Sequence, residues 1–354
     1  MRYTGLINHY KNRLPVDENT RFISLGEGNT PLIRLENIPA LLGKKVDIYV
    51  KYEGLNPTGS FKDRGMTMAV TKAVEAGSKA IICASTGNTS ASAAAYAARA
   101  GIKAFVLIPE GKIALGKLAQ AMIHGAVIIQ IKGNFDDGMR LVKEVADHAP
   151  VSIVNSINPF RLQGQKTAAF EIIEELGEAP DYHCLPVGNA GNISAHWIGY
   201  TEYHQEGKAN NTPRMVGYQA AGAAPFVKGK MIDNPETIAT AIRIGHPQSW
   251  DLAHKVEKES NGWFDAISDD DILAAQKLLT EQEGIFCEPA SATSLAGAML
   301  DIKSGKIPEG SKIVCTLTGH GLKDPDTAIA QCKDEMININ PVMEEVKKAI
   351  LSNM

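Results

Sequence analysis

Short apolar runs alternate with helical stretches along this chain from residue 46 onward, and no other feature constrains its fold as strongly. The β-rich runs fall at 46–52, 80–84, 103–108, 126–131, near 151, at 182–187 and at 312–317. The helical stretches fall at 61–76, 89–100, 115–124, 135–148, 160–176, 192–204 and 269–283, the last with Ser268 as a plausible N-cap. Strands that alternate with helices of about 10–15 residues predict parallel βαβ units, and therefore an α/β fold with doubly wound, mostly parallel sheets.

The length of the chain, 354 residues, allows two domains with a large shared core. No repeat or low-complexity linker marks a boundary, but a Gly/Pro turn at 55–59 and an Asn/Pro turn at 158–159 interrupt the pattern. We therefore predict a smaller α/β domain at 58–155, inserted into a larger one made of 1–57 and 156–354. Ligands of doubly wound folds bind at the carboxyl ends of strands, so we expect the site in the cleft between the two domains.

Composition excludes several classes of function. The 36 basic and 40 acidic residues give a net charge of −4, and no segment concentrates Lys and Arg with aromatic residues, so we expect no nucleic-acid partner. No run of about 18 apolar residues predicts a transmembrane helix, and residues 1–13 lack the apolar core of a signal peptide. The five cysteines are widely spaced without a CxxC pair, which argues against a metal site or a disulfide framework. We expect a cytoplasmic protein without membrane partners.

The motif NPTGSFKDRG at 56–65 places Lys62 in the first turn of the helix predicted at 61–76, with Ser60 as a possible cap. A cation is disfavoured at a helix N-terminus, so the pKa of the Lys62 ammonium should be lowered. Such a position suits a lysine that acts as a neutral nucleophile. A solvated lysine near a helix start is the ordinary alternative.

Two further motifs lie where a predicted strand leads into a helix, a place where backbone N–H groups and the helix dipole favour anions. STGNTSAS at 85–92 is rich in hydroxyl groups, although a Ser/Thr-rich helix cap would look similar. PVGNAGN at 186–192 consists of small residues that let the backbone approach an anion closely. It matches neither GxGxxG nor the phosphate loop of NTPases, and an isolated Gly-rich turn is more often only a turn.

Two more motifs supply polar side chains at strand ends. In TLTGHGLKD at 316–324, Thr318 could hydrogen-bond a heterocyclic nitrogen without placing a charge beside it, whereas His320 between two glycines is more often structural. In NSINPFRLQGQKT at 155–167, Asn155, Ser156 and Arg161 offer donors, and a guanidinium can bind phosphate in a bidentate way. An activated lysine with several anion sites indicates an enzyme for a phosphorylated cofactor and a small anionic substrate.

Together these motifs resemble the fold-type II enzymes that use pyridoxal 5′-phosphate (PLP), the tryptophan synthase β-like family. Within that family they resemble the short-form threonine synthases. EGNTPL at 27–32 and EPASA at 288–292 extend the likeness over nearly the whole chain. The resemblance implies a homodimer of fold-type II architecture.

By this resemblance, Lys62 is the catalytic lysine that forms the Schiff base with PLP. The residues implied at the cofactor are Asn88 at its 3′ oxygen, Gly188, Asn189, Ala190, Gly191 and Asn192 around its phosphate, and Thr318 at its pyridine nitrogen. The residues implied at the substrate carboxylate are Ser85, Thr86, Asn88 and Thr89, and those at the substrate phosphate are Thr89, Asn155, Ser156 and Arg161. No metal is implied.

The implied reaction converts O-phospho-L-homoserine and water to L-threonine and phosphate, the last step of threonine biosynthesis. A serine/threonine dehydratase of the same fold is the alternative. Dehydratases usually carry a glycine run at the cofactor phosphate and a serine at the ring nitrogen, where this chain has GNAGN and Thr318. A catalytically silent PLP-binding protein should lose the lysine or the carboxylate site, and a nucleotide-dependent oxidoreductase should carry GxGxxG.

Overall fold

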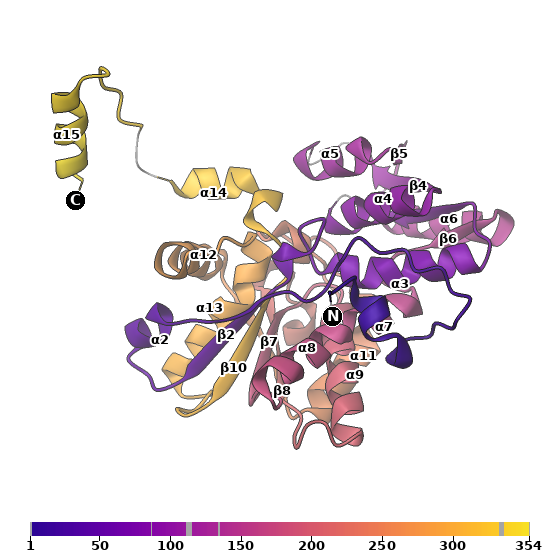
Figure 1. Ribbon diagram of the computed structural model, residues 1–354, viewed down its shortest axis with the longest axis horizontal. Helices are drawn as coiled ribbons and strands as arrows, with labels where there is room; N and C mark the ends of the chain where they lie inside the picture. The colour runs from indigo at the N-terminus through magenta and orange to yellow at the C-terminus, as the bar shows by residue number, and fades with distance from the viewer. Residues whose placement is uncertain (1, 86, 111–114, 134, 333–335, 354) are drawn as a thin grey trace.

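The computed structural model describes residues 2–353 apart from 86, 111–114, 134 and 333–335 (Figure 1). Within these residues the strands form two sheets, one of six strands and one of four. The larger sheet has the order β1-β2-β10-β7-β8-β9, with bounds Leu32–Arg34, Asp47–Tyr52, Lys312–Leu317, Tyr182–Pro186, Arg214–Ala220 and Trp263–Ile267. Only its edge strand β1 runs antiparallel to its neighbour. The α/β class and the mostly parallel sheets are thus confirmed.

The smaller sheet has the order β5-β4-β3-β6 and is parallel throughout. Its strands are Val127–Ile131, Lys103–Pro109, Ala80–Ala84 and Val151–Ile153. All four come from one continuous stretch of chain, whereas the strands of the larger sheet come from both sides of that stretch. The boundaries at 58 and 155 remain a prediction, and the change of sheet between β2 and β3 and between β6 and β7 is compatible with them.

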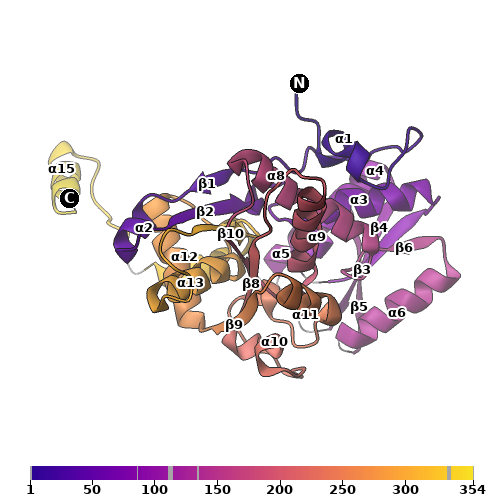
Figure 2. The same cartoon turned by 90° about the horizontal axis from the view of Figure 1, so that it is seen from below.

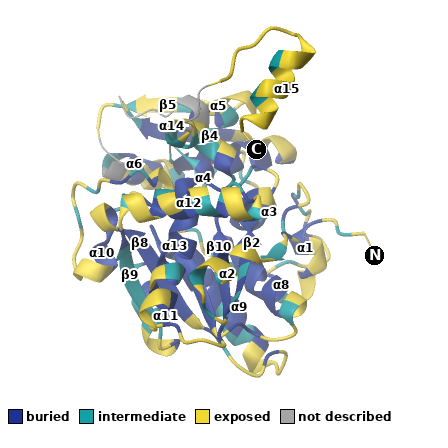
Figure 3. Ribbon diagram, turned by 90° about the vertical axis from the view of Figure 1, so that its left-hand side faces the viewer, coloured by how far each residue is buried: buried dark blue, intermediate teal, exposed yellow. Residues whose placement is uncertain are grey.

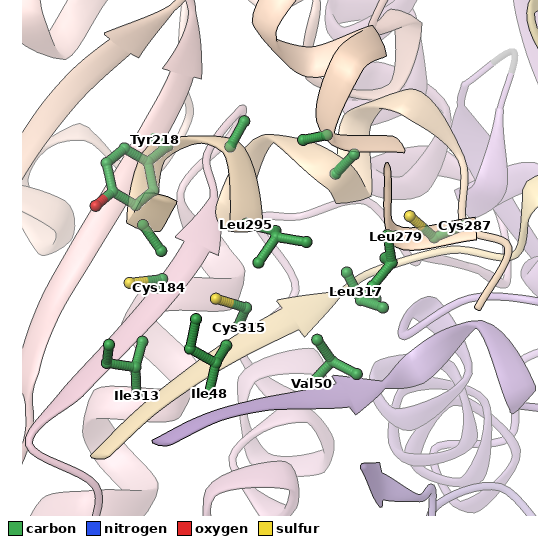
Figure 4. Packing of buried hydrophobic residues seen from close by; sticks show 14 of the residues in the cluster. Ile48, Val50, Cys184, Tyr218, Leu279, Cys287, Leu295, Ile313, Cys315 and Leu317 are labelled. Carbon is green, nitrogen blue, oxygen red and sulfur yellow. The ribbon is translucent and has the colours of Figure 1, made fainter. Parts of the chain in front are cut away.

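Helices cover both faces of each sheet, because the buried residues of each strand alternate between two separate apolar clusters. One face of the larger sheet packs on α2 (Asn37–Leu42), α12 (Asp269–Glu283) and α13 (Pro289–Ser304). Figure 4 shows this cluster, in which Cys315 and Leu317 of β10 meet Leu295 of α13. The opposite face packs on α1 (Leu6–His9), α8 (Thr167–Leu176), α9 (Gly191–Gln205), α10 (Pro225–Lys228) and α11 (Trp250–Glu259).

The smaller sheet is also enclosed on both sides. Helices α3 (Lys62–Glu75), α4 (Asn88–Ala100) and α5 (Leu115–Ile123) cover one face, and α6 (Phe135–His148) covers the other. Figure 2 shows the two sheets side by side. Helices α3 and α7 (Pro159–Gln165) pack against each other. Short 3-10 turns complete the described elements, at Lys11–Arg13, Glu53–Leu55, Ala221–Ala223, Thr240–Ile242 and Gly321–Lys323.

One predicted helix is divided. The stretch expected to be a single helix at 160–176 forms α7 and α8, which meet at Lys166. The hydroxyl of Thr167 donates to the carbonyl oxygen of Gly164 at 2.6 Å, a side-chain bond that competes with the helical backbone bond at this point. Gly164 itself packs tightly, because a Cβ there would lie 1.8 Å from the carbonyl oxygen of Arg64 in α3.

The C-terminal part contrasts with the buried core of the two sheets (Figure 3). Helix α14 (Pro325–Gln331) lies on the surface, and α15 (Met343–Leu351), which has no buried residue, projects from the body in Figure 1. Of the described helices, none is long and apolar enough to cross a membrane. Four of the five cysteines are buried free thiols, and Cys332 is exposed.

Candidate active site

Lys62 is the first residue of α3 and lies where the two sheets meet. The backbone just before it is fixed to the end of β10: the N–H of Phe61 donates to the carbonyl oxygen of Thr318 at 3.0 Å, and Ser60 forms a β-bridge with Gly319. The predicted cap is displaced by one residue, because Phe61 is the N-cap and the Ser60 hydroxyl accepts only a long 3.4 Å bond from the Lys62 N–H. This turn therefore takes its shape from β10 and not from a Ser60 cap.

Burial and, to a smaller extent, the nearby Arg161 guanidinium lower the pKa of the Lys62 ammonium to about 7, while Glu288 opposes both effects. The helix dipole was expected to lower this pKa, and burial with a neighbouring cation gives the same direction. Nζ lies 3.7 Å from the centroid of the Phe61 ring. Near neutral pH a substantial fraction of Lys62 is thus an uncharged amine that can act as a nucleophile or base.

The loop after β3 carries the residues that were predicted to bind the substrate carboxylate. The hydroxyl of Ser85 accepts a bond from the N–H of Gly87 at 3.2 Å, and Asn88 begins α4. Asn88 is buried; its Nδ2 donates to Glu288 Oε1 at 2.9 Å, and its Oδ1 has no partner among the described residues. Thr89, on the next position of the helix, is partly exposed. Thr86 lies outside the described residues.

The loop after β7 leads into α9 and has the features of a phosphate site. Ala190, its N-cap, adopts the left-handed conformation with φ 64°, which turns the chain sharply before Gly191. At Gly188 a Cβ would lie 3.2 Å from the Cα of Ile242, so only glycine fits without displacing that backbone. Asn189 receives the N–H of Gln248 on its Oδ1 at 3.2 Å.

Asn192 stands in the first turn of α9 and is 8% exposed, and its Nδ2 lacks a partner in the described part of the chain. A buried amide donor without an acceptor is costly unless a ligand completes it. Beside the N-terminus of a helix of 15 residues, the ligand that fits is an anion such as a phosphate group.

At the end of β10, Thr318 is buried, and its Oγ1 lies 2.9 Å from the Oγ of Ser291 in α13. Ser291 also accepts the N–H of Gly319 at 2.8 Å. A hydroxyl in this position can hydrogen-bond a neutral ring nitrogen, which is the role predicted for Thr318. The sequence interpretation did not assign Ser291 a role, although EPASA contains it.

Arg161 is 3% exposed in α7 and has few partners. Its Nη1 donates to the carbonyl oxygen of Val154 at 3.3 Å, and its Nε has no partner among the described residues. Burial lowers its pKa to about 10. A buried guanidinium without a carboxylate partner in the described chain is suited to bind an anionic ligand.

The two residues predicted beside Arg161 differ in their surroundings. Asn155 is buried, and its amide binds both the N–H of Ala84 at 3.0 Å and the carbonyl oxygen of Ala84 at 2.9 Å. It therefore joins the ends of β6 and β3, and only its remaining donor could contact a ligand. Ser156 follows it and is partly exposed.

A buried ionic cluster supports this site, and the sequence interpretation missed it. Arg64 binds Glu53 and Glu171 at 2.6 Å each, and Lys51 binds Glu171 at 2.7 Å. All four side chains are at most 9% exposed, so two cations and two anions balance in the interior. The cluster anchors α3, and with it Lys62, to β2 and α8.

His320 has a structural environment. Its Nδ1 accepts the N–H of Leu322 at 3.1 Å, its ring stacks on Tyr52, and burial lowers its pKa. Across the described residues, no group of three or more His, Cys, Asp or Glu side chains is placed to hold a metal ion.

Comparison with known proteins agrees with this geometry. A family model described as "Pyridoxal-phosphate dependent enzyme" matches residues 23–319. The threonine synthase of Synechocystis sp. is 56% identical over 350 residues, covering 99% of this chain and 91% of the relative. The threonine synthase of Halalkalibacterium halodurans is 55% identical, covering 100% of this chain and 98% of the relative.

Solved structures with the same fold are more distant in sequence. Maize serine racemase superposes with a TM-score of 0.71 at 23% identity, covering 92% of this chain and 94% of that one. The processed threonine deaminase isoform 2 of Solanum lycopersicum has a TM-score of 0.71 at 23% identity, covering 85% and 86%. These structures support the fold-type II architecture.

Proposed function

Because the chain belongs to the threonine synthases, a group of PLP-dependent lyases, we propose that it converts O-phospho-L-homoserine and water to L-threonine and phosphate with the cofactor bound to Lys62. The observation that carries the proposal is the pairing of a lysine whose pKa is lowered to about 7 with a buried guanidinium, Arg161, that has no carboxylate partner in the described chain.

The cofactor would occupy the space between the strand ends. The loop 188–192 and the N-terminus of α9 would bind its phosphate, since the Nδ2 of Asn192 has no acceptor among the described residues. Asn88 would contact its 3′ oxygen and Thr318 its ring nitrogen. When bound, PLP supplies the electron sink that stabilises negative charge on the substrate carbons.

The chain's own residues would bind the substrate and move protons. Ser85, Thr89 and Asn88 at the start of α4 would hold the substrate carboxylate, together with Thr86. In the loaded site the Lys62 amine would take a proton from the substrate Cα and return protons later, which its lowered pKa allows near neutral pH.

The substrate phosphate would bind at Arg161, with Ser156, Thr89 and the remaining donor of Asn155 nearby. An anion there neutralises the buried guanidinium and keeps the leaving group oriented. This feature favours a phosphorylated substrate over the hydroxyl amino acids that a serine/threonine dehydratase would use.

The direct experiment is to incubate the purified holoenzyme with O-phospho-L-homoserine, and separately with L-threonine and L-serine. We expect equal amounts of phosphate and threonine from the first substrate and little 2-oxo acid from the others. Formation of 2-oxo acid without release of phosphate would instead identify the dehydratase.

We also propose that the enzyme acts in the cytoplasm as a homodimer. The four buried thiols are compatible with a reducing compartment. Sedimentation of the purified protein, which should give twice the mass of 38.0 kDa, tests the oligomeric state.

A further inference from the structure

The carboxylate of Glu288 lies inside the site, yet none of the roles above uses it. Glu288 occupies the N-cap position of α13, where a polar side chain commonly accepts bonds from the first N–H groups of the helix. Its side chain makes no such cap. Instead Oε1 accepts the Nδ2 hydrogen of Asn88 at 2.9 Å, across 200 residues of sequence. The carboxylate is thus directed away from its own helix and toward α4.

The surrounding backbone makes room for this arrangement. Glu288 is 1% exposed, and its N–H donates to the carbonyl oxygen of Gly319 at 3.0 Å. A Cβ on Gly319 would lie 2.3 Å from Oε1 and 2.6 Å from Cδ, so glycine at this position lets the carboxylate lie directly beside the strand end that carries Thr318. The carboxylate is therefore fixed between β10, α13 and α4.

The charge of Glu288 acts on Lys62. A cation and an anion act on it in opposite directions, since Arg161 lowers the pKa of Lys62 and Glu288 raises it. A buried carboxylate is costly unless nearby charges or donors stabilise it, and here Lys62, the amide of Asn88 and the N-terminus of α13 all do so.

We propose that Glu288 is a positioning residue that holds the Asn88 amide in one orientation and supplies the counter-charge for the nitrogen of Lys62. An ionised carboxylate only accepts hydrogen bonds, so Asn88 must turn its Nδ2 toward Glu288. The buried Oδ1 and the second Nδ2 hydrogen of Asn88 are then presented to the cofactor in a fixed arrangement. The inference rests on the cofactor site proposed at Lys62.

The test is Glu288→Gln in the holoenzyme. Glutamine keeps the size of the side chain and can still accept from Asn88, but it removes the charge and can also donate. The readout is the pH midpoint at which the visible absorbance of the bound cofactor changes. We expect this midpoint to fall by about 1 pH unit or more, as when an opposite charge within about 4–6 Å is removed. We also expect kcat to fall with little change in KM. An unchanged midpoint would overturn the proposal.

A second variant separates the charge from the hydrogen bond. Asn88→Asp with Glu288→Gln keeps the total charge and one hydrogen bond, but exchanges donor and acceptor. We expect the melting temperature of this double variant to return toward that of the wild type, while the absorbance midpoint and kcat do not. Recovery of wild-type kcat would show that Asn88 needs no fixed orientation. Glu281→Gln, on the exposed face of α12, is the matched control and should change neither readout.

Failure of the proposed function and failure of the role proposed for Glu288 give different results. If the wild-type enzyme bound no cofactor at Lys62, no visible absorbance would be present and the proposed function itself would fail. If Glu288→Gln does not fold, Gly319→Ala provides the same test, because its added methyl group displaces the carboxylate without removing it. A wild-type midpoint in folded Gly319→Ala would then contradict the proposal.

Discussion

Replacing Arg161 by methionine should make the cofactor-loaded protein more stable and inactive at once. The guanidinium is 3% exposed, its Nε has no partner in the described chain, and its bond to the carbonyl oxygen of Val154 is 3.3 Å long. Methionine fills a similar volume without a charge to desolvate. If Arg161 is reserved for the substrate phosphate, the wild-type protein carries an uncompensated buried charge whenever substrate is absent.

The lowered pKa gives the size of that cost. Burial moves the pKa of Arg161 from 12.5 to about 10. At about 1.36 kcal/mol per unit, keeping the group charged at pH 7 destabilises the fold by about 3 kcal/mol. The bond to Val154 offsets about 1 kcal/mol of this, so Arg161→Met should raise the free energy of unfolding by about 2 kcal/mol.

Urea unfolding of the holoenzyme, with and without inorganic phosphate, measures both the cost of the buried charge and its relief by a bound anion. If the cofactor occupies the loop at 188–192, as we propose, added phosphate should stabilise the wild type through Arg161, by about 2.7 kcal/mol at 100 times its Kd. Arg161→Met should lose that response. Arg140→Met, at an exposed residue paired with Glu144, is the control, and its stability should change by about 0.5 kcal/mol or less.

The reasoning is refuted if Arg161→Met is less stable than the wild type without phosphate and still gains stability when phosphate is added. That result would mean that the guanidinium is a structural part of the fold and that the anion binds elsewhere.

Two further predictions concern buried carboxylates. Burial raises the pKa of Asp63 from 3.8 to about 6, so the folded protein binds this proton more tightly than the unfolded chain does. The free energy of unfolding should therefore fall by about 3 kcal/mol as pH rises from about 4 to about 6, and it should not recover at higher pH. In Asp63→Asn this part of the pH dependence of urea unfolding should be absent, and an identical slope in both proteins would contradict it. Glu171 accepts bonds from Arg64 and Lys51, so Glu171→Gln leaves buried cations uncompensated and should cost about 3–5 kcal/mol in the same assay, whereas exposed Glu175→Gln should cost little.

Local patterns were sufficient to predict part of the framework, although β1, β8, β9, α11 and α13 were not among the expected elements. Period, caps and glycines indicated β3 at Ala80–Ala84 and β10 at Lys312–Leu317 with their observed bounds, and Ser268 caps α12 as expected. The predicted helix at 61–76 placed Lys62 in its first turn, and because that position is unfavourable for a lysine chosen only for stability, Lys62 was interpreted as a nucleophile. Each of these inferences depends on residues close together in the sequence.

The remaining features depend on contacts between distant segments. The bond between Asn88 and Glu288 joins residues 200 positions apart, and the pair Arg64–Glu171 joins residues 107 apart. No periodicity links such residues, so the sequence interpretation gave Glu288 no role and missed the ionic cluster. The division between α7 and α8 was missed because it depends on one side-chain hydrogen bond and on the close approach of Gly164 to α3.

The central claim is that Lys62 carries the cofactor, and borohydride reduction of the holoenzyme followed by peptide mass spectrometry tests it most directly. Reduction makes the bond between the lysine nitrogen and the cofactor permanent. We predict that the peptide containing Lys62 gains the mass of the reduced cofactor and that Lys62→Ala shows neither this modification nor visible absorbance. Stoichiometric labelling of another lysine, such as Lys51 in the ionic cluster, would contradict the account.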